Sequence, residues 1–135
     1  MYRKIGFIVL TLIFLSSFVM MASAATLADE YFDSAGITLT TAEAGSFSAT
    51  TRFIVGFIKV NSCWLQKWNG SSWQYYCWLP APSNIEYNTI GYDAYIDYSA
   101  YVPNDGGTYR IGAYYNADGH TIPRYSNSRT FAQYP

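Results

Sequence analysis

Both cysteines and all four tryptophans of this 135-residue chain lie within residues 63–78. The segment consists of two aromatic, alternating runs that meet at Asn69 and Gly70. An Asn-Gly pair tolerates positive φ angles, so it lets two antiparallel strands reverse direction within a few residues. The segment therefore predicts a β-hairpin, and the rest of the fold must be arranged around it.

The N-terminal segment predicts export. Two basic residues precede an unbroken apolar run over residues 5–20, and small residues follow at 22–24 with the spacing that signal peptidase requires. The alternative, a transmembrane anchor, is disfavoured because an apolar run of this length falls short of the roughly 20 residues needed to cross a bilayer. We expect a signal peptide over residues 1–24, cleavage after Ala24, and a secreted mature protein without stable membrane insertion.

Length and charge limit the classes of protein that the remainder can be. After residue 24 the chain has six basic and nine acidic side chains and no basic cluster. Nucleic acid is not an expected partner, because phosphate binding depends on grouped Lys and Arg. Residues 25–36 are polar and acidic without a repeating pattern, which predicts a loose N-terminal arm. Residues 37–135 are long enough for a single domain with its own core.

Short alternating runs separated by turn signals predict about seven strands and no helix. The alternation is clearest in residues 92–98 and 109–115, which are bounded by turns rich in Asn, Asp and Gly. Further strands are expected near residues 37–41, 47–51, 53–68, 73–79 and 126–131. The fourth of these five stops at two prolines, and the third is too long to be flat, so we expect a bend near Gly56. The pattern predicts an all-β, small antiparallel β-sandwich, with a small barrel as the alternative.

Cys63 and Cys77 are an even pair in a chain that we expect to be exported, which favours a disulfide. Zinc would need four ligands, and the single histidine, His120, supplies no matching spacing. A disulfide between neighbouring strands needs directly opposed residues. We therefore expect a three-residue loop at 69–71, or a bulge, that brings Cys63 opposite Cys77. Closing this loop would stabilise the fold by about 3 kcal/mol.

This register also predicts the two sides of the hairpin. One side, with the disulfide, Leu65 and Tyr75, is expected to face the core. The other side would form an exposed ligand-binding platform of Trp64, Trp68, Tyr76 and Trp78 with Gln66 and Gln74. Aromatic rings flanked by amide hydrogen-bonding groups suit a glycan. The opposite orientation would place the same tryptophans in the core.

The chain offers little for catalysis. His120 lies in a turn-rich segment, where a lone histidine is usually solvated. Asp93 and Asp97 share one face of a strand, and exposed acids on a half-buried strand explain them more simply than an acid–base pair does. Turn chemistry rather than calcium ligation accounts for Asp105, Asn116 and Asp118. We expect no enzymatic activity, no metal and no cofactor.

The aromatic content favours binding. After residue 24 the chain keeps 13 tyrosines, four tryptophans and five phenylalanines, more rings than a two-sheet core of this size can bury. The simplest explanation is strand propensity and rim packing, and the functional one is a non-catalytic binding module for a glycan, the cell envelope or a protein. The alternatives are a secreted antibacterial or effector protein, disfavoured because the chain lacks a cationic amphipathic face, and a secreted structural protein.

Tyr109 is part of two resemblances. It follows a Gly-rich turn and precedes Ile111 and Ala113, which resembles the penultimate strand of fibronectin type III and immunoglobulin-like domains, where a tyrosine pins the preceding corner. In addition, Leu-Gln-Lys-Trp-Asn-Gly at residues 65–70 with Trp73, and Gly-Thr-Tyr-Arg-Ile at residues 107–111, resemble an uncharacterised family of small secreted bacterial proteins.

This second resemblance extends over residues 45–131. The chain departs from the family pattern in having Lys67 where arginine is usual and in its cysteine pair across the hairpin. The resemblance implies a β-sandwich and export, and it assigns no activity.

Overall fold

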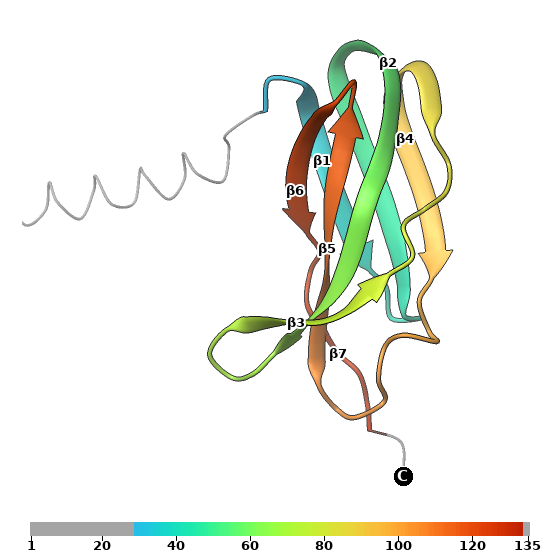
Figure 1. Ribbon diagram of the computed structural model, residues 1–135. Coiled ribbons are helices and arrows are strands. Elements are labelled where there is room, and N and C mark those ends of the chain that lie inside the picture. Colours follow the sequence, from blue (N-terminus) through green and yellow to red (C-terminus); the bar gives the residue numbers. More distant parts are fainter. Residues whose placement is uncertain (1–28, 134–135) are drawn as a thin grey trace, which may run out of the picture.

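The computed structural model describes residues 29–133, which form seven strands and no helix. The strands are β1 (Phe32–Leu39), β2 (Ala44–Trp68), β3 (Trp73–Leu79), β4 (Glu86–Asp97), β5 (Thr108–Ala117), β6 (His120–Tyr125) and β7 (Arg129–Thr130). All pairs are antiparallel and belong to one curled sheet (Figure 1). The expected all-β antiparallel fold is confirmed, while the predicted signal peptide lies outside the described residues.

The 25-residue strand β2 connects the two halves of the sheet. Its first part lies between β1 and β4. It pairs with β5 from Ile58 onward, and from Cys63 onward it lies between β5 and β3. β6 continues the second half beyond β5. The pairing register with β4 shifts between Thr50 and Val55, immediately before Gly56, where the sequence predicts a bend. One continuous strand thus replaces the two separate strands expected over residues 47–68.

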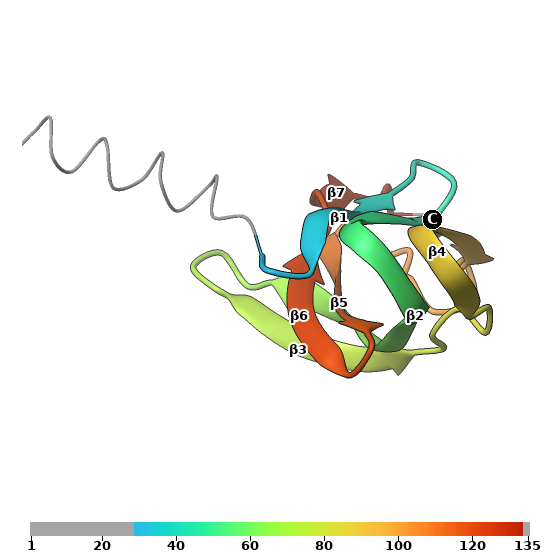
Figure 2. The same cartoon turned by 90° about the horizontal axis from the view of Figure 1, so that it is seen from above.

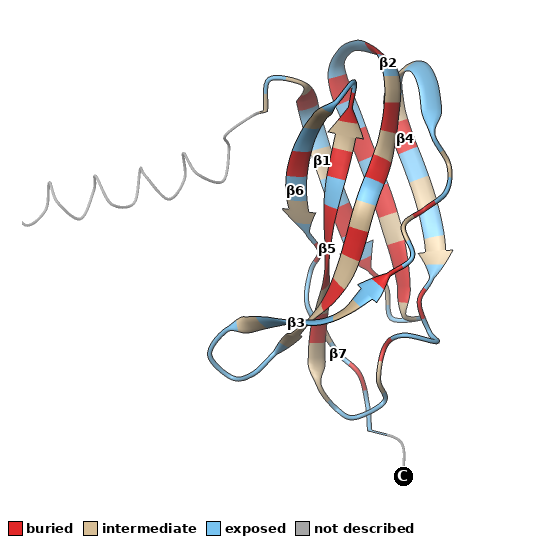
Figure 3. Cartoon of the chain, viewed as in Figure 1, coloured by how far each residue is buried: buried red, intermediate tan, exposed pale blue. Residues whose placement is uncertain are grey.

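The sheet curls so that its two halves face each other (Figure 2), and buried side chains from both halves form the core. Buried and more exposed positions alternate along β2 and β5 (Figure 3). In β5, Tyr109, Ile111, Ala113 and Tyr115 are all buried, as the alternating sequence predicts. Complete burial of a large apolar side chain stabilises a fold by about 1.5–3 kcal/mol. β5 is therefore a central element of the core as well as a central strand of the second half.

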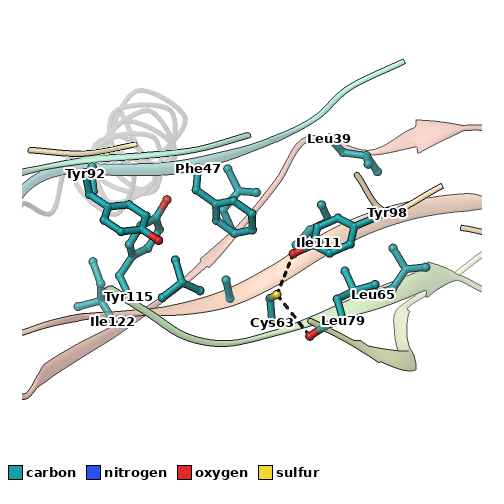
Figure 4. Close-up of a cluster of buried hydrophobic side chains, with 14 of the residues drawn as sticks. Leu39, Phe47, Cys63, Leu65, Leu79, Tyr92, Tyr98, Ile111, Tyr115 and Ile122 are labelled. Carbon is teal, nitrogen blue, oxygen red and sulfur yellow. Dashed lines mark hydrogen bonds between the residues drawn. The ribbon is translucent and has the colours of Figure 1, made fainter. Parts of the chain in front are cut away.

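Buried tyrosines make the core partly polar (Figure 4). The Tyr98 hydroxyl donates to the Pro80 carbonyl at 2.7 Å, and the Tyr92 hydroxyl donates to the Asn84 carbonyl at 3.2 Å. A buried hydroxyl without a partner would cost about 1–3 kcal/mol. These hydrogen bonds remove that cost and also anchor the connection between β3 and β4.

The hairpin of β2 and β3 reverses at Asn69 and Gly70, as the sequence predicts, but its loop is four residues long (69–72). Trp68 and Trp73 are the closing pair. The Asn69 side chain accepts hydrogen bonds from the backbone N–H groups of residues 71 and 72, at 2.9 and 2.8 Å. This local hydrogen bonding stabilises a loop one residue longer than the three-residue loop expected.

The predicted disulfide is wrong. The longer loop, together with an extra residue in β3 near Tyr76, places Cys63 opposite Leu79 and Cys77 opposite Leu65. Both cysteines are free thiols. The Cys63 thiol instead lies 3.2 Å from the Tyr98 hydroxyl, inside the core (Figure 4).

The positions of three other segments differ from expectation. Residues 32–36 belong to β1 rather than to a loose arm, because Phe32 is buried in the core. A register irregularity between Phe32 and Ser34 interrupts the alternation that would reveal this strand in the sequence. The sequence pattern does not predict β6, because this strand contains Pro123. An edge strand such as β6 tolerates proline. The last expected strand is reduced to the two residues of β7.

Candidate functional site

The side of β3, β2, β5 and β6 that faces away from the core carries residues in one register row. Trp78 of β3 pairs with Trp64 of β2, Trp64 pairs with Gly112 of β5, and Gly112 pairs with Tyr125 of β6. The ring centroid of Trp64 lies 6.1 Å from that of Trp78 and 6.2 Å from that of Tyr125, both edge to face. This row is a continuous aromatic surface across four strands.

Gly112 is required in this row. A Cβ atom at this position would lie 2.5 Å from the Trp64 ring, so the indole packs directly against the backbone of β5. Tyr114, two residues along β5, contacts the same indole with a centroid distance of 5.4 Å. Trp64 is therefore half-buried and held in place by its neighbours, while Trp78 is 63% exposed.

A polar pair lies beside this aromatic row. Arg110 of β5 pairs with Gln66 of β2, and its Nε atom donates to the Gln66 side-chain oxygen at 2.7 Å. The guanidinium carbon lies 4.4 Å from the Trp73 ring centroid and 4.3 Å from that of Tyr125. Both distances are short enough for cation–π attraction. Burial lowers the pKa of Arg110, which still stays charged at physiological pH because its usual value is above 12.

We call this surface the outer aromatic face. Its members are Trp64, Trp68, Trp73, Tyr75, Trp78, Tyr114 and Tyr125, together with Gln66 and Arg110.

The structure places four of the six residues predicted to form a platform on this face: Trp64, Trp68, Trp78 and Gln66. The other two, Tyr76 and Gln74, lie on the opposite side of the hairpin, because the extra residue in β3 changes the alternation. Tyr76 contacts the core residue Tyr109 at 5.6 Å, and Gln74 donates to the Ser72 hydroxyl. Tyr75, expected in the core, is 56% exposed on the outer aromatic face.

Besides Tyr75, four members of the face were not anticipated: Trp73, Arg110, Tyr114 and Tyr125. The alternation of residues 109–115 already implies that Arg110 and Tyr114 point away from the core. No comparable signal exists for Tyr125, because the strand that carries it is interrupted by proline.

Next to the turn of the β2–β3 hairpin, Lys67 and Asp105 form an ion pair at 2.8 Å. Tyr109 donates its hydroxyl proton to the same carboxylate at 2.9 Å, and so does the Gly107 N–H. These three donors, with Lys67 the strongest, lower the pKa of Asp105 to about 2. In immunoglobulin-like domains the corresponding tyrosine donates to a backbone group, whereas the Tyr109 hydroxyl donates to a side-chain carboxylate. The strand that carries Tyr109 is also not the penultimate one, because both β6 and β7 follow it. The cluster holds the hairpin to the turn before β5.

The one histidine is engaged in a structural contact. His120 lies 2.9 Å from the Asp29 carboxylate, and its ring stacks on Tyr31 at 4.5 Å. Partial burial would raise the pKa of Asp29, but hydrogen bonds from His120 and from two backbone N–H groups hold it below its usual value. These contacts fasten the segment before β1 to the start of β6.

The other candidate acids also have local roles or face solvent. Asp93 and Asp97 are exposed on β4, and Asp97 accepts a hydrogen bond from the Ser99 N–H. Asp118 accepts from the N–H groups of Gly56 and Phe57, at 3.1 and 3.0 Å, and so fixes the bend of β2. Within residues 29–133, no three His, Cys, Asp or Glu side chains lie close enough together to hold a metal ion.

In the part of the chain that the structure describes, no helix is long and apolar enough to cross a membrane. No protein-family model, curated protein or solved structure matches this chain. The functional assignment therefore depends on the geometry of the outer aromatic face.

Proposed function

We propose that this protein is a secreted, non-catalytic binding module that holds a glycan against its outer aromatic face. The observation that carries the proposal is the register row of Trp78, Trp64 and Tyr125 across four strands. A sugar ring presents a C–H face that packs on the electron-rich face of an aromatic ring, and its hydroxyls need nearby hydrogen-bonding groups. Gln66 and Arg110 supply such groups beside the rings.

The rigidity of the face supports this role. Trp64 is held over Gly112, and Arg110 is held between Trp73 and Tyr125. Groups that are already ordered lose little conformational entropy when a ligand binds, so more of the contact energy contributes to affinity. Strand propensity alone would scatter exposed rings singly, whereas a contiguous exposed apolar patch usually marks an interaction site.

Two further parts of the proposal have separate support. Export rests on the N-terminal sequence, in which an apolar run ends in small residues at 22–24. The assignment to a β-sandwich rests on β2, because its two parts belong to two halves of the sheet with a common core between them.

Binding of the purified protein to a glycan array tests the proposal. Trp78→Ala and Tyr75→Ala should each weaken binding about tenfold to the glycans that the unsubstituted protein binds, since aromatic contacts contribute about 0.5–1.5 kcal/mol beyond their buried area. Tyr95→Ala is the matched control, because Tyr95 is 67% exposed on β4, in the other half of the sheet.

Unchanged melting temperatures would exclude unfolding as the cause of lost binding. If the protein binds no glycan of the array, or if Trp78→Ala binds as well as the unsubstituted protein, the proposal is wrong. If the immobilised protein captures an envelope protein and binds no glycan, the ligand is a protein and not a glycan.

A further inference from the structure

Arg110 has no acidic neighbour in the described part of the chain. The ion pairs within residues 29–133 join Lys67 to Asp105 and His120 to Asp29 and Glu30. Within the described residues the Arg110 side chain donates one hydrogen bond, from Nε to the Gln66 side-chain oxygen. Its two terminal amino groups, Nη1 and Nη2, are therefore left without a hydrogen-bond acceptor among these residues.

The acids of this chain lie elsewhere. Asp105 is held by Lys67 next to the turn of the β2–β3 hairpin, and Asp29 is held by His120 at the start of β6. Asp93 and Asp97 are exposed on β4, in the other half of the sheet. Arg110 is the one charged member of the outer aromatic face, so this face is positively charged although the whole chain has a formal net charge of −1.

The geometry of Arg110 limits the shape of an anion that it can bind. The rings of Trp73 and Tyr125 lie within 4.4 Å of the guanidinium carbon, so they occupy space through which a ligand would otherwise approach the guanidinium group. A ligand reaches the free amino groups most readily in the guanidinium plane. A carboxylate is planar and can accept two parallel N–H···O bonds in that plane. A sulfate or phosphate ester is tetrahedral, so its remaining oxygens would be directed toward the flanking rings.

We infer that the ligand is an acidic polysaccharide whose carboxylate is bound by Arg110 while adjacent sugar rings pack on Trp78 and Tyr125. This inference rests on the proposed function and narrows its ligand to uronic-acid glycans. Gln66 acts as a positioning residue, because it holds Nε and so orients Nη1 and Nη2 toward the ligand.

Three uronic-acid oligosaccharides, namely oligogalacturonate, oligomannuronate and hyaluronan fragments, serve as probes. Each is compared with its carboxyl-reduced counterpart, which keeps the sugar chain and removes the charge. Calorimetry should show that at least one acidic probe binds tenfold or more tightly than its reduced form. Raising the salt concentration should weaken only the acidic probe, because Arg110 is partly exposed. Dextran sulfate and dextran provide the tetrahedral and neutral controls.

Variants of Arg110 locate the effect. Arg110→Gln should remove the tenfold preference, so that the variant binds the acidic probe and its reduced form with equal affinity. Arg110→Lys keeps the charge without the planar fork and should recover less than half of the preference in free-energy terms. Arg52→Gln is the matched control, because Arg52 is an exposed arginine of β2 outside this face.

The outcomes separate the two proposals. If acidic and reduced probes bind equally, and Trp78→Ala weakens both, the carboxylate inference is overturned and the glycan-binding function stands. Tighter binding of dextran sulfate than of every uronic acid overturns the preference for a planar anion. If none of the probes binds while the glycan array retains other sugars, the inference is overturned alone. Should Arg110→Gln fail to fold, the comparison of probes on the unsubstituted protein still decides.

Discussion

Cys63 lies opposite Leu79 across the β2–β3 ladder, so it is displaced by two residue positions from Cys77. Its thiol is within 3.2 Å of the Tyr98 hydroxyl and donates to the carbonyls of Leu79 and Pro80. The sulfur of Cys63 is thus a core group with local polar partners, and the stability of the domain comes from packing rather than from a crosslink.

The two thiols should differ in reactivity. Burial raises the pKa of both, and Cys63 is buried whereas Cys77 is only half-buried. At neutral pH a thiol reagent should label Cys77 slowly, and Cys63 only when the protein unfolds. Mass spectrometry after labelling in denaturant without reductant should show two labels per chain. A chain that accepts none would contradict the free thiols.

Gly112→Ala should destabilise the protein by about 1–3 kcal/mol, because the added methyl group would overlap the Trp64 ring. The displaced indole should also change the near-ultraviolet circular dichroism of the folded protein. Gly36→Ala is the control, since nothing lies within 4 Å of its added Cβ atom. Equal unfolding free energies for the two variants would show that Trp64 does not rest on Gly112.

Asp105 should contribute to stability in a defined range of pH. Its pKa is lowered in the folded protein to about 2, so the contribution is complete above the unfolded value of about 4 and disappears as the pH falls through the folded value. Denaturant unfolding of the original protein and of Asp105→Asn should give a difference that is constant above about pH 5 and shrinks toward pH 2. Asp33→Asn is the control substitution, because Asp33 is an exposed acid of β1. A difference that persists unchanged at pH 2 would argue against the ion pair.

The buried tyrosines predict alkaline unfolding. Burial raises the pKa of Tyr92 and Tyr109 to about 12, and raises those of Tyr98 and Tyr115 further. Because the folded values exceed the unfolded value of about 10, stability should be unaffected below pH 10 and fall as the pH rises above it. Absorbance at about 295 nm, where tyrosinate absorbs, should show a delayed class of tyrosines that ionise together with unfolding.

Tyr98→Phe tests this mechanism. It should lose about 1 kcal/mol at neutral pH, since the Pro80 carbonyl loses its hydroxyl donor, and its stability should fall less steeply above pH 10. Ionisation of every tyrosine near pH 10 in a protein that remains folded would contradict the burial of these hydroxyls.

Cleavage after Ala24 remains a prediction from the sequence alone. The intact mass of the protein recovered from the culture medium should correspond to a chain that begins at Ala25. A product that retains residues 1–24, or that is found only inside the cell, would contradict both cleavage and export.

The sequence predicts the β2–β3 hairpin because Asn69 and Gly70 form a local signal that needs no other part of the chain. Its register is not local. Residues 73–78 are nearly all aromatic or apolar, so the pattern looks the same whether or not one extra residue is inserted. The insertion near Tyr76 exchanges Tyr75 and Tyr76 between the two sides and separates the cysteines.

The outer aromatic face depends on contacts between strands that are distant in sequence. Gln66 and Arg110 each lie in a segment that the sequence predicts to be a strand. Only the pairing of these two strands in the sheet brings the two side chains together. The position of Tyr125 on this face could not be predicted, because Pro123 interrupts the strand pattern of β6. Periodicity predicts which side of a strand is buried, and it does not predict which strands are neighbours.

A single strand that serves both halves of the sheet has a consequence for how the domain folds. No fragment that ends within β2 keeps a complete set of neighbours, because β1 and β4 need its first part and β3 and β5 need its last part. Folding must bring together residues as far apart as Asp29 and His120, and such non-local pairing is slow to form. The domain should therefore unfold in one cooperative step, so the outer aromatic face exists only when the whole domain is folded.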